Sequence, residues 1–247
     1  MSIPSFTHKI AITSLVLLGI ATAGIRYQFI NYQIGLILFS FAGLLSFCSI
    51  CASALFTRRT TNPQGRRKLS NAALIALPAI AFLSLSLFRG AGAPLINDIS
   101  TDTQRPPDFL KAAEIRKPKD NSVIYTSTNV ALQEQAYPKI KTHQTSLSVA
   151  QAHNLGLKIA SEMGWLVYYQ QEGHIEAQSR SFWLGFIDDI VVRIQATSTG
   201  ARIDLRSASR FGKGDLGVNA NRITVFLEKF SLNEQTETAR TATSTQQ

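Results

Sequence analysis

Acidic residues are absent from the first 89 positions of this 247-residue chain, and cysteine is absent after Cys51. The formal net charge is +9. Most of this excess lies before residue 90, because the 17 lysines and arginines after it face 16 aspartates and glutamates. A near-neutral C-terminal part offers no basic stripe for a phosphate backbone, so we expect no nucleic-acid partner. Without cysteine, this part must be stabilised by packing and not by disulfides.

Charged side chains are also missing from three long apolar runs, residues 10–25, 34–56 and 69–88. A helix that crosses a bilayer needs about 20 apolar residues. We therefore interpret residues 1–89 as a transmembrane region with helices at about 10–30, 34–56 and 69–88. The lipid bilayer is the first expected partner.

The loop TRRTTNPQGRRK (57–68) carries five lysines and arginines. Short loops rich in these residues stay in the cytoplasm. The sequence thus predicts a multi-pass protein of the inner (cytoplasmic) membrane, with a cytoplasmic N-terminus and a periplasmic C-terminal domain.

Two features of the apolar runs have a second interpretation. Ala21-Thr22-Ala23 resembles a signal-peptidase site; we favour an uncleaved helix, because Phe29 and Ile30 continue the apolar segment. Cys48 and Cys51 form a C-x-x-C motif, but hydrocarbon disfavours the thiolate that redox chemistry needs. We interpret them as packing residues.

The part after residue 89 divides by composition. Glycines and prolines interrupt residues 90–145, which we expect to form an extended tether and irregular lead-in with a short helix near 128–135. Helical periodicity at 146–163 and 215–232 encloses four strand candidates, at 165–171, 174–180, 188–197 and 201–209. The predicted fold is α+β over 146–232, a four-stranded antiparallel meander flanked by two helices. The Thr-, Gln- and Ser-rich tail, 233–247, is expected to be disordered.

Arginine and aspartate gather on the last two strands. A two-residue turn at Thr199-Gly200 would place Ile194 opposite Leu205 and Arg193 opposite Arg206. The charged face would then be either an ion-pair lattice or an anion site that grips a carboxylate or phosphate. The candidate ligand-binding residues are Asp189, Arg193, Asp204, Arg206, Arg210 and Lys213.

The glycine-rich stretch after the last strand has two interpretations as well. Asp215 can cap the next helix, or the helix start and Lys213 can bind phosphate. The cap is favoured, because an aspartate competes with an incoming anion for the same N–H groups. Asp98-x-Ser100-x-Asp102 resembles the start of a calcium loop, but Thr103 and Phe109 stand where glycine and glutamate are required. We predict no metal.

Catalytic signals are few, which favours a protein without enzymatic activity. The histidines lack metal-ligand spacing, and no G-x-S-x-G motif is present. Asp188 and Asp189 point to opposite faces of their strand. We predict no cofactor.

The segments "INDISTD…PPDF" (96–109), "GFIDDIVVRI" (185–194) and "IDLRSASRFGKGDLGVNANRI" (203–223) resemble the family known as domain of unknown function 1499. The resemblance covers essentially the whole C-terminal domain and implies no established activity. It implies that the following residues occupy family motif positions: Asn97, Asp98, Thr101, Asp102, Asp188, Asp189, Arg193, Asp204, Arg206, Ser207, Ser209, Arg210, Asp215, Gly217, Asn219 and Arg222.

The leading functional hypothesis is an envelope module that binds an anionic ligand or a protein partner through its Arg/Asp-rich strand face. Two alternatives stay open. One is a hydrolase-like enzyme acting on a phosphate- or carboxylate-bearing substrate. The other is a structural subunit of a membrane complex.

Overall fold

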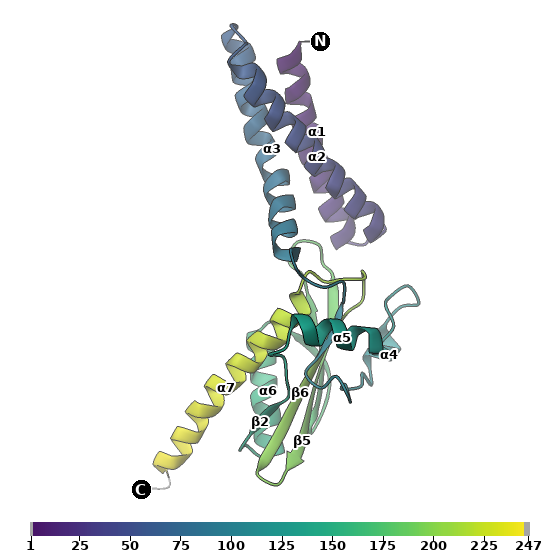
Figure 1. The fold of residues 1–247 in the computed structure, drawn as a ribbon, viewed down its shortest axis with the longest axis vertical. Coiled ribbons are helices and arrows are strands. Elements are labelled where there is room, and N and C mark those ends of the chain that lie inside the picture. The colour runs from purple at the N-terminus through teal and green to yellow at the C-terminus, as the bar shows by residue number, and fades with distance from the viewer. Residues whose placement is uncertain (1, 245–247) are drawn as a thin grey trace. The chain divides into compact units, whose positions relative to one another are not determined.

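The computed structural model describes residues 2–244 and divides into two compact units (Figure 1). One unit comprises the chain up to Ala91 together with Phe182–Gly185. The other comprises Gly92–Ser181 together with the chain from Phe186 onward.

The first unit contains the helices α1 (Ile3–Arg26), α2 (Tyr32–Thr57) and α3 (Pro63–Gly90). All three are long and apolar enough to cross a membrane, as the sequence predicts. They also begin earlier than their apolar runs, and at α3 the reason is local: Asn62 accepts a hydrogen bond from the amide of Gln64, and Pro63 occupies the first turn. Small residues meet between the helices, where the hydroxyls of Ser14 and Ser46 lie 2.9 Å apart.

The second unit is an α+β domain with an antiparallel sheet of six strands, not four. The strand order is β1-β6-β5-β4-β3, and β2 also pairs with β6. The predicted meander corresponds to β3 to β6, so α+β is confirmed. The extra strands lie in the lead-in and have three residues each, too few to show an alternating pattern. The strands are β1 (Asp98–Ser100), β2 (His143–Thr145), β3 (Leu166–Gln171), β4 (His174–Arg180), β5 (Ile187–Thr197) and β6 (Gly200–Ser209).

The predicted register of β5 and β6 is wrong by two residues. The turn is Ser198-Thr199, because Thr197 pairs with Gly200. Arg193 consequently lies opposite Asp204, which replaces the expected pair of arginines by a pair of opposite charges. A shift of two residues keeps every side chain on its predicted face.

Gly200 belongs to the strand and not to the turn because β2 runs close beside it. Its φ is +147°, and a Cβ atom there would lie 2.2 Å from the carbonyl oxygen of Thr145. Only glycine fits this approach.

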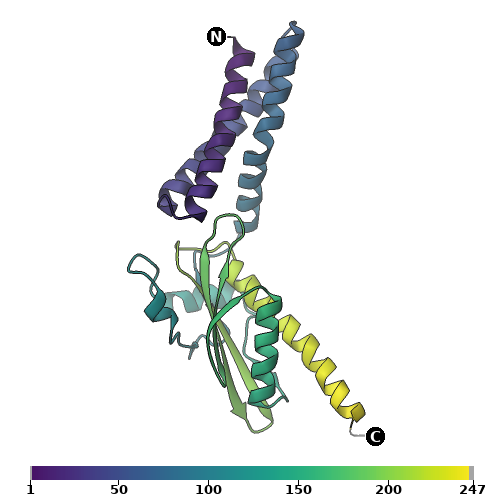
Figure 2. The ribbon, with the colours of Figure 1, turned by 180° about the vertical axis from the view of Figure 1, so that it is seen from behind.

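The helices α6 (Val149–Glu162) and α7 (Val218–Ser244) cover one face of the sheet and enclose the main core (Figure 2). Ser148 and Gln151 form a reciprocal capping box at the start of α6. α7 continues through residues 233–244, where the sequence predicts a disordered tail; residues 245–247 lie outside the described residues. The central core residues are Leu155, Ile159, Trp165, Ile175, Ile190, Val192, Ile194, Ile203, Leu205, Ile223, Phe226 and Phe230.

The other face of the sheet is covered by the lead-in itself. This segment includes α4 (Ala112–Ile115) and α5 (Ser127–Ala136), the latter close to the short helix predicted at 128–135. Phe109 and Ala112 pack on Val191 and Ala208 in a small second cluster. The segment between β1 and α5 thus forms a lid of irregular structure over the charged strand positions.

Candidate functional site

The charged strand face is an extended set of buried ion pairs beneath the lead-in. Arg206 is its most deeply buried cation, with 2% of its surface exposed. Its Nε and Nη2 atoms lie 2.9 and 2.7 Å from the two carboxylate oxygens of Asp98. Further N–H groups donate to the carbonyl oxygens of Pro107 and Val123. Burial raises the pKa of Asp98, whereas the hydrogen bonds and charge of Arg206 act against this rise. The ionised state of Asp98 therefore depends on its partner.

Two aromatic rings enclose the same guanidinium. The carbon of the Arg206 guanidinium lies 4.9 Å from the ring centroid of Phe109 and 5.3 Å from that of Tyr125. Such cation–π contacts are strongest when the cation is removed from water. These contacts hold the Arg206 side chain in place and stabilise its positive charge.

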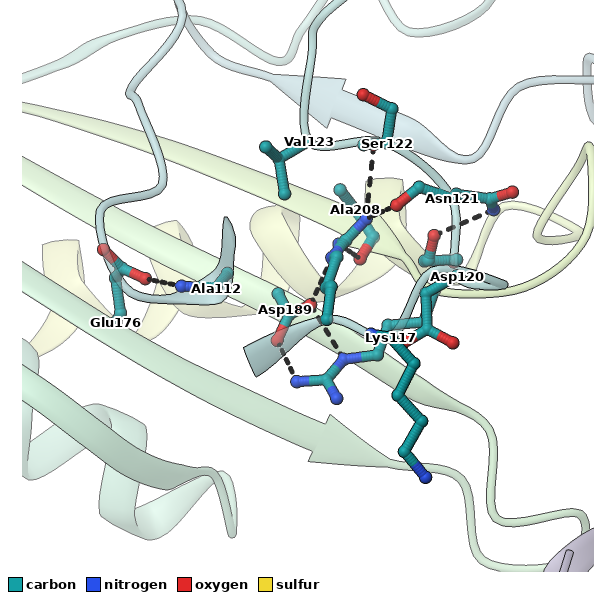
Figure 3. A network of polar contacts seen from close by, with 12 residues as sticks. Ala112, Lys117, Asp120, Asn121, Ser122, Val123, Glu176, Asp189 and Ala208 are labelled. Atoms are coloured by element: carbon teal, nitrogen blue, oxygen red, sulfur yellow. Dashed lines mark hydrogen bonds and ion pairs between the residues drawn. The ribbon is translucent and has the colours of Figure 1, made fainter. Parts of the chain in front are cut away.

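A second cluster is centred on Asp189, which is fully buried (Figure 3). Arg210 binds its carboxylate through two N–H groups, at 3.0 and 2.8 Å. Arg116 from the lead-in adds a third bond at 2.7 Å and also donates to the carbonyl oxygen of Ala208. Arg116 therefore ties the covering segment to both central strands, to β5 through Asp189 and to β6 through Ala208.

Glu176 on β4 lies fully buried beneath the start of α4 (Figure 3). Its oxygens accept hydrogen bonds from the backbone N–H groups of Leu110, Lys111 and Ala112, and His174 lies 2.9 Å away. Burial disfavours the charge, but the bonds from His174 and the three amides outweigh it and hold the pKa of Glu176 below its ordinary value. This carboxylate is a structural anchor for the covering segment.

The third cluster joins Arg193 and Arg202 to Asp102 and Asp204. Each arginine contacts both carboxylates, at distances between 2.7 and 3.2 Å. The pKa of Asp102 is low although burial alone would raise it, because the Arg105 and Gln104 amides and Arg202 donate to it. Asp102 belongs to the lead-in, so this cluster also fastens the cover to the sheet.

The helical face carries a smaller polar group beside the main core. Arg222 lies 2.7 Å from Asp188 and donates to the hydroxyl of Ser207. Ser207 also donates to Asn219, whose amide donates in turn to Ser209 and to the carbonyl oxygen of Asn97.

Asp215 caps α7, as favoured from the sequence. It accepts hydrogen bonds from the backbone N–H groups of Gly217 and Asn219, at 2.9 and 2.6 Å. Lys213 is exposed in the same loop. A carboxylate therefore already occupies the position that an incoming anion would take.

The structure separates the candidate residues into different environments. Arg193 and Asp204 share one cluster, Asp189 and Arg210 share another, Arg206 pairs with Asp98, and Lys213 belongs to none of them. Thr101 joins the third cluster by a hydrogen bond to Asp204. Sequence reasoning did not select Arg202, Arg116, Glu176, Tyr125 or Tyr168, whose hydroxyl lies 3.3 Å from Glu176 and 3.4 Å from Asp189. Only Arg202 gave a signal, through its spacing from Asp204 on one strand face.

A groove of about 750 Å³ opens where the cover does not close over Arg206. Arg206 forms part of its lining, together with Phe109 and Tyr125. Burial raises the pKa of Tyr125, so the phenol stays neutral and donates to Gln133. The remaining lining residues are Thr103, Gln104, Pro106, Asp108, Val123, Ile124, Ser127 and Val130.

Residues 98–230 match the model of a family described as a protein of unknown function (DUF1499). The chain belongs to the DUF1499 family. The resemblance drawn from the motifs is therefore confirmed. A comparison with curated proteins finds no match. The part matched to DUF1499 contains all of the ion pairs described above, together with the groove.

Proposed function

We propose that this DUF1499 protein is a multi-pass protein of the inner membrane whose periplasmic domain binds a ligand or a protein partner without catalysing a reaction. The basic loop between α2 and α3 supports the orientation. The groove over Arg206 supports the binding role, and it is the observation that carries the proposal.

The groove favours an occupant that is mainly apolar. Phe109, Val123, Ile124, Tyr125 and Val130 provide apolar wall surface. The charge of Arg206 is already balanced by the bidentate carboxylate of Asp98. An anion would therefore gain little from it, whereas an apolar side chain or acyl group would remove wall surface from water.

Arg206 can still contribute one directional contact. A guanidinium has five N–H groups, and four of those of Arg206 donate to Asp98, Pro107 and Val123. The fifth has no acceptor among the described residues, and because Arg206 lines the groove we propose that this N–H donates to a carbonyl or hydroxyl oxygen of the occupant. This matches pockets in which apolar walls give affinity and a few fixed polar groups give orientation.

The arrangement of the carboxylates supports a role other than hydrolysis. General acid–base catalysis requires a carboxyl group within about 3 Å of a reacting atom. Asp98, Asp188, Asp189 and Asp204 each bind at least one arginine and are buried. Their oxygens accept hydrogen bonds from guanidinium and hydroxyl groups inside the protein, so the carboxylate that the groove lining presents to solvent is that of the exposed Asp108.

Native mass spectrometry of the intact protein, released gently from its own membranes, tests the binding role. Ile124 lines the groove and is 74% exposed, so Ile124→Arg should fold normally while it obstructs the groove. Ile115→Arg is the matched control, because Ile115 is also exposed but does not line the groove. We expect an added mass in the wild type and the control that is lost in Ile124→Arg. Bare protein in all three samples, or an added mass that Ile124→Arg retains, would overturn the proposal.

A further inference from the structure

A pocket of about 390 Å³ lies at one end of the first unit. This volume is within the range of about 300–1,000 Å³ that is common for small-ligand sites. The start of α1, the end of α2, the loop that follows it and the first turns of α3 line the pocket. The amino terminus and the junction of α2 and α3 lie together at this end (Figures 1 and 2). We call it the basic pocket and define it by Ser2, Ser5, Arg59, Thr60, Gly65 and Lys68.

The loop between α2 and α3 is held in a fixed arrangement around the pocket. Arg66 Nε donates to the carbonyl oxygen of Thr60 at 2.6 Å, and the Thr60 hydroxyl donates to that of Phe56 at 2.8 Å. Gly65 lies where the loop and the start of α1 both approach α3. A Cβ atom there would lie 2.7 Å from Cγ2 of Thr60 and 3.3 Å from Cγ of Pro4. Packed segments of three elements therefore give the pocket its shape.

Two cations line the pocket, and neither has a carboxylate partner. Lys68 Nζ donates at 3.0 Å to the hydroxyl of Ser5, which is a neutral acceptor. The exposed guanidinium of Arg59 has no hydrogen-bond or ion-pair partner among the described residues. Residues 1–91 and 182–185, which make up this unit, contain no aspartate or glutamate. An anion that balances these charges must therefore come from outside the unit.

The pocket also offers neutral donors that suit phosphate oxygens. The hydroxyls of Ser2 and Ser5 lie 3.2 Å apart, and Ser5 accepts from Ser2 and from Lys68, so its own hydrogen can be directed at an acceptor in the pocket. α1 begins here, and the side chain of its N-cap residue Ser2 makes no capping hydrogen bond. The first N–H groups of α1 thus keep hydrogen-bonding capacity. These donors add to the two cations, which carry the site.

The pocket lies just outside the apolar part of its own unit. The apolar run of α1 begins at residue 10, that of α2 ends at 56, and that of α3 begins at 69. The lining segments 2–5 and 59–68 directly flank these runs. In a bilayer crossed by the three helices they would lie at the level of the headgroups. Basic pockets between membrane helices are suited to anionic headgroups at this depth.

We propose that the basic pocket binds the phosphate headgroup of an anionic phospholipid. Arg59 and Lys68 contact the phosphate oxygens, Ser5 donates a hydrogen bond to them, and the acyl chains follow the apolar surface of the helices. The bound lipid joins the start of α1 to the start of α3. This rests on the membrane-crossing helices of the proposed function, and it is independent of the groove in the second unit.

Titration with defined lipids tests this in the full-length protein, purified and delipidated in a neutral detergent and observed by native mass spectrometry. Phosphatidylglycerol and phosphatidylcholine with identical acyl chains are added separately. We expect phosphatidylglycerol to bind roughly tenfold more tightly to the wild type, and Arg59→Gln/Lys68→Gln to lose this preference. Arg58→Gln/Arg67→Gln is the matched control and should keep it, because it removes two exposed charges of the same loop that do not line the pocket.

Alkaline extraction of membranes shows whether the variants are still inserted. Both double variants should stay in the membrane fraction, so that a lost preference is not lost insertion. If Arg59→Gln/Lys68→Gln is not inserted, Arg59→Gln alone is compared with Arg58→Gln. The wild type without a preference for phosphatidylglycerol, or an equal loss of preference in pocket and control variants, would overturn the proposal.

Two further arms identify the source of the phosphate and the site. Glycerol 3-phosphate carries the phosphate without acyl chains; if it binds as tightly as phosphatidylglycerol, the occupant is a soluble phosphate and the lipid proposal is wrong. Ile124→Arg obstructs only the groove and should bind phosphatidylglycerol like the wild type; loss of binding there would place the lipid in the groove. In protein released from its own membranes the two occupants are separate added masses, one removed by Ile124→Arg and the other by Arg59→Gln/Lys68→Gln.

Discussion

At the scale of single residues, the buried pair of Arg206 and Asp98 is the clearest determinant of stability. Removal of one member of a buried ion pair leaves an uncompensated charge, at a cost of about 3–5 kcal/mol. We therefore expect Arg206→Met to lower the free energy of unfolding of the domain by about 3–5 kcal/mol. The measurement is urea unfolding of the full-length protein in detergent, followed by emission from Trp165, which stacks on Phe226 in the core.

The double variant Asp98→Leu/Arg206→Met separates charge from packing. It removes both charges, so it should recover much of the stability lost in the single variant. Lys158→Ala is the control, because its pair with Glu162 is exposed and should change stability by about 1 kcal/mol or less. A single variant as stable as this control would show that the pair does not stabilise the domain.

Because the pKa of Glu176 is lowered in the folded protein, we expect the stability of the domain to fall as the pH is lowered. Its pKa is lower in the folded state than in an unfolded chain, so the stability it contributes is fully present above the ordinary glutamate pKa of about 4.3. This contribution disappears as the pH falls through the folded-state value. We expect Glu176→Gln to be less stable at pH 7 and to lose less stability than the wild type on acidification, as measured by urea midpoints at a series of pH values.

The matched control for Glu176 is Glu114→Gln, which removes an exposed carboxylate from the adjacent helix α4. It should keep the acid dependence of the wild type. If Glu176→Gln retains that dependence too, Glu176 does not contribute to the acid dependence, and its pKa is not lowered in the folded state.

At the scale of elements, local signals in the sequence are sufficient where the structure is local. The helix predicted at 146–163 is an example, since its apolar face repeats within the helix itself; of the two possible caps, Ser146 and Ser148, the structure selects Ser148, which forms a capping box with Gln151. Ser148→Ala should lower the free energy of unfolding by about 1 kcal/mol, because the backbone N–H of Gln151 loses its acceptor. Urea unfolding measures this, and Ser146→Ala, two residues earlier and outside the box, should have little effect. Equal losses in both variants would contradict the assignment of the cap.

Elements that depend on distant parts of the chain were harder to predict. β1 and β2 exist because three-residue segments of the lead-in reach the free edge of β6. The register of β5 and β6 depends on the close approach of Thr145 to Gly200. Neither relation produces a periodic pattern within a window of sequence.

At the scale of the whole molecule, the contrast between local signals and contacts from distant segments explains which parts of the site were predictable. The strand arginines and aspartates could be selected, because alternation places them on one face of the sheet. Their partners could not, since Arg116 and Asp102 lie in a segment without regular structure. Whether the face is open or covered depends on where that segment lies, and the groove over Arg206 exists only because its coverage is incomplete.

The orientation of the whole chain gives the last prediction. In a Cys48→Ala/Cys51→Ala background, a single cysteine replaces Thr61 between α2 and α3 or Ser198 in the domain. If the basic loop is cytoplasmic, a maleimide that cannot cross the membrane should label Ser198→Cys in intact spheroplasts and Thr61→Cys only after lysis. The reverse pattern would place the domain in the cytoplasm. The groove would then face cytoplasmic partners.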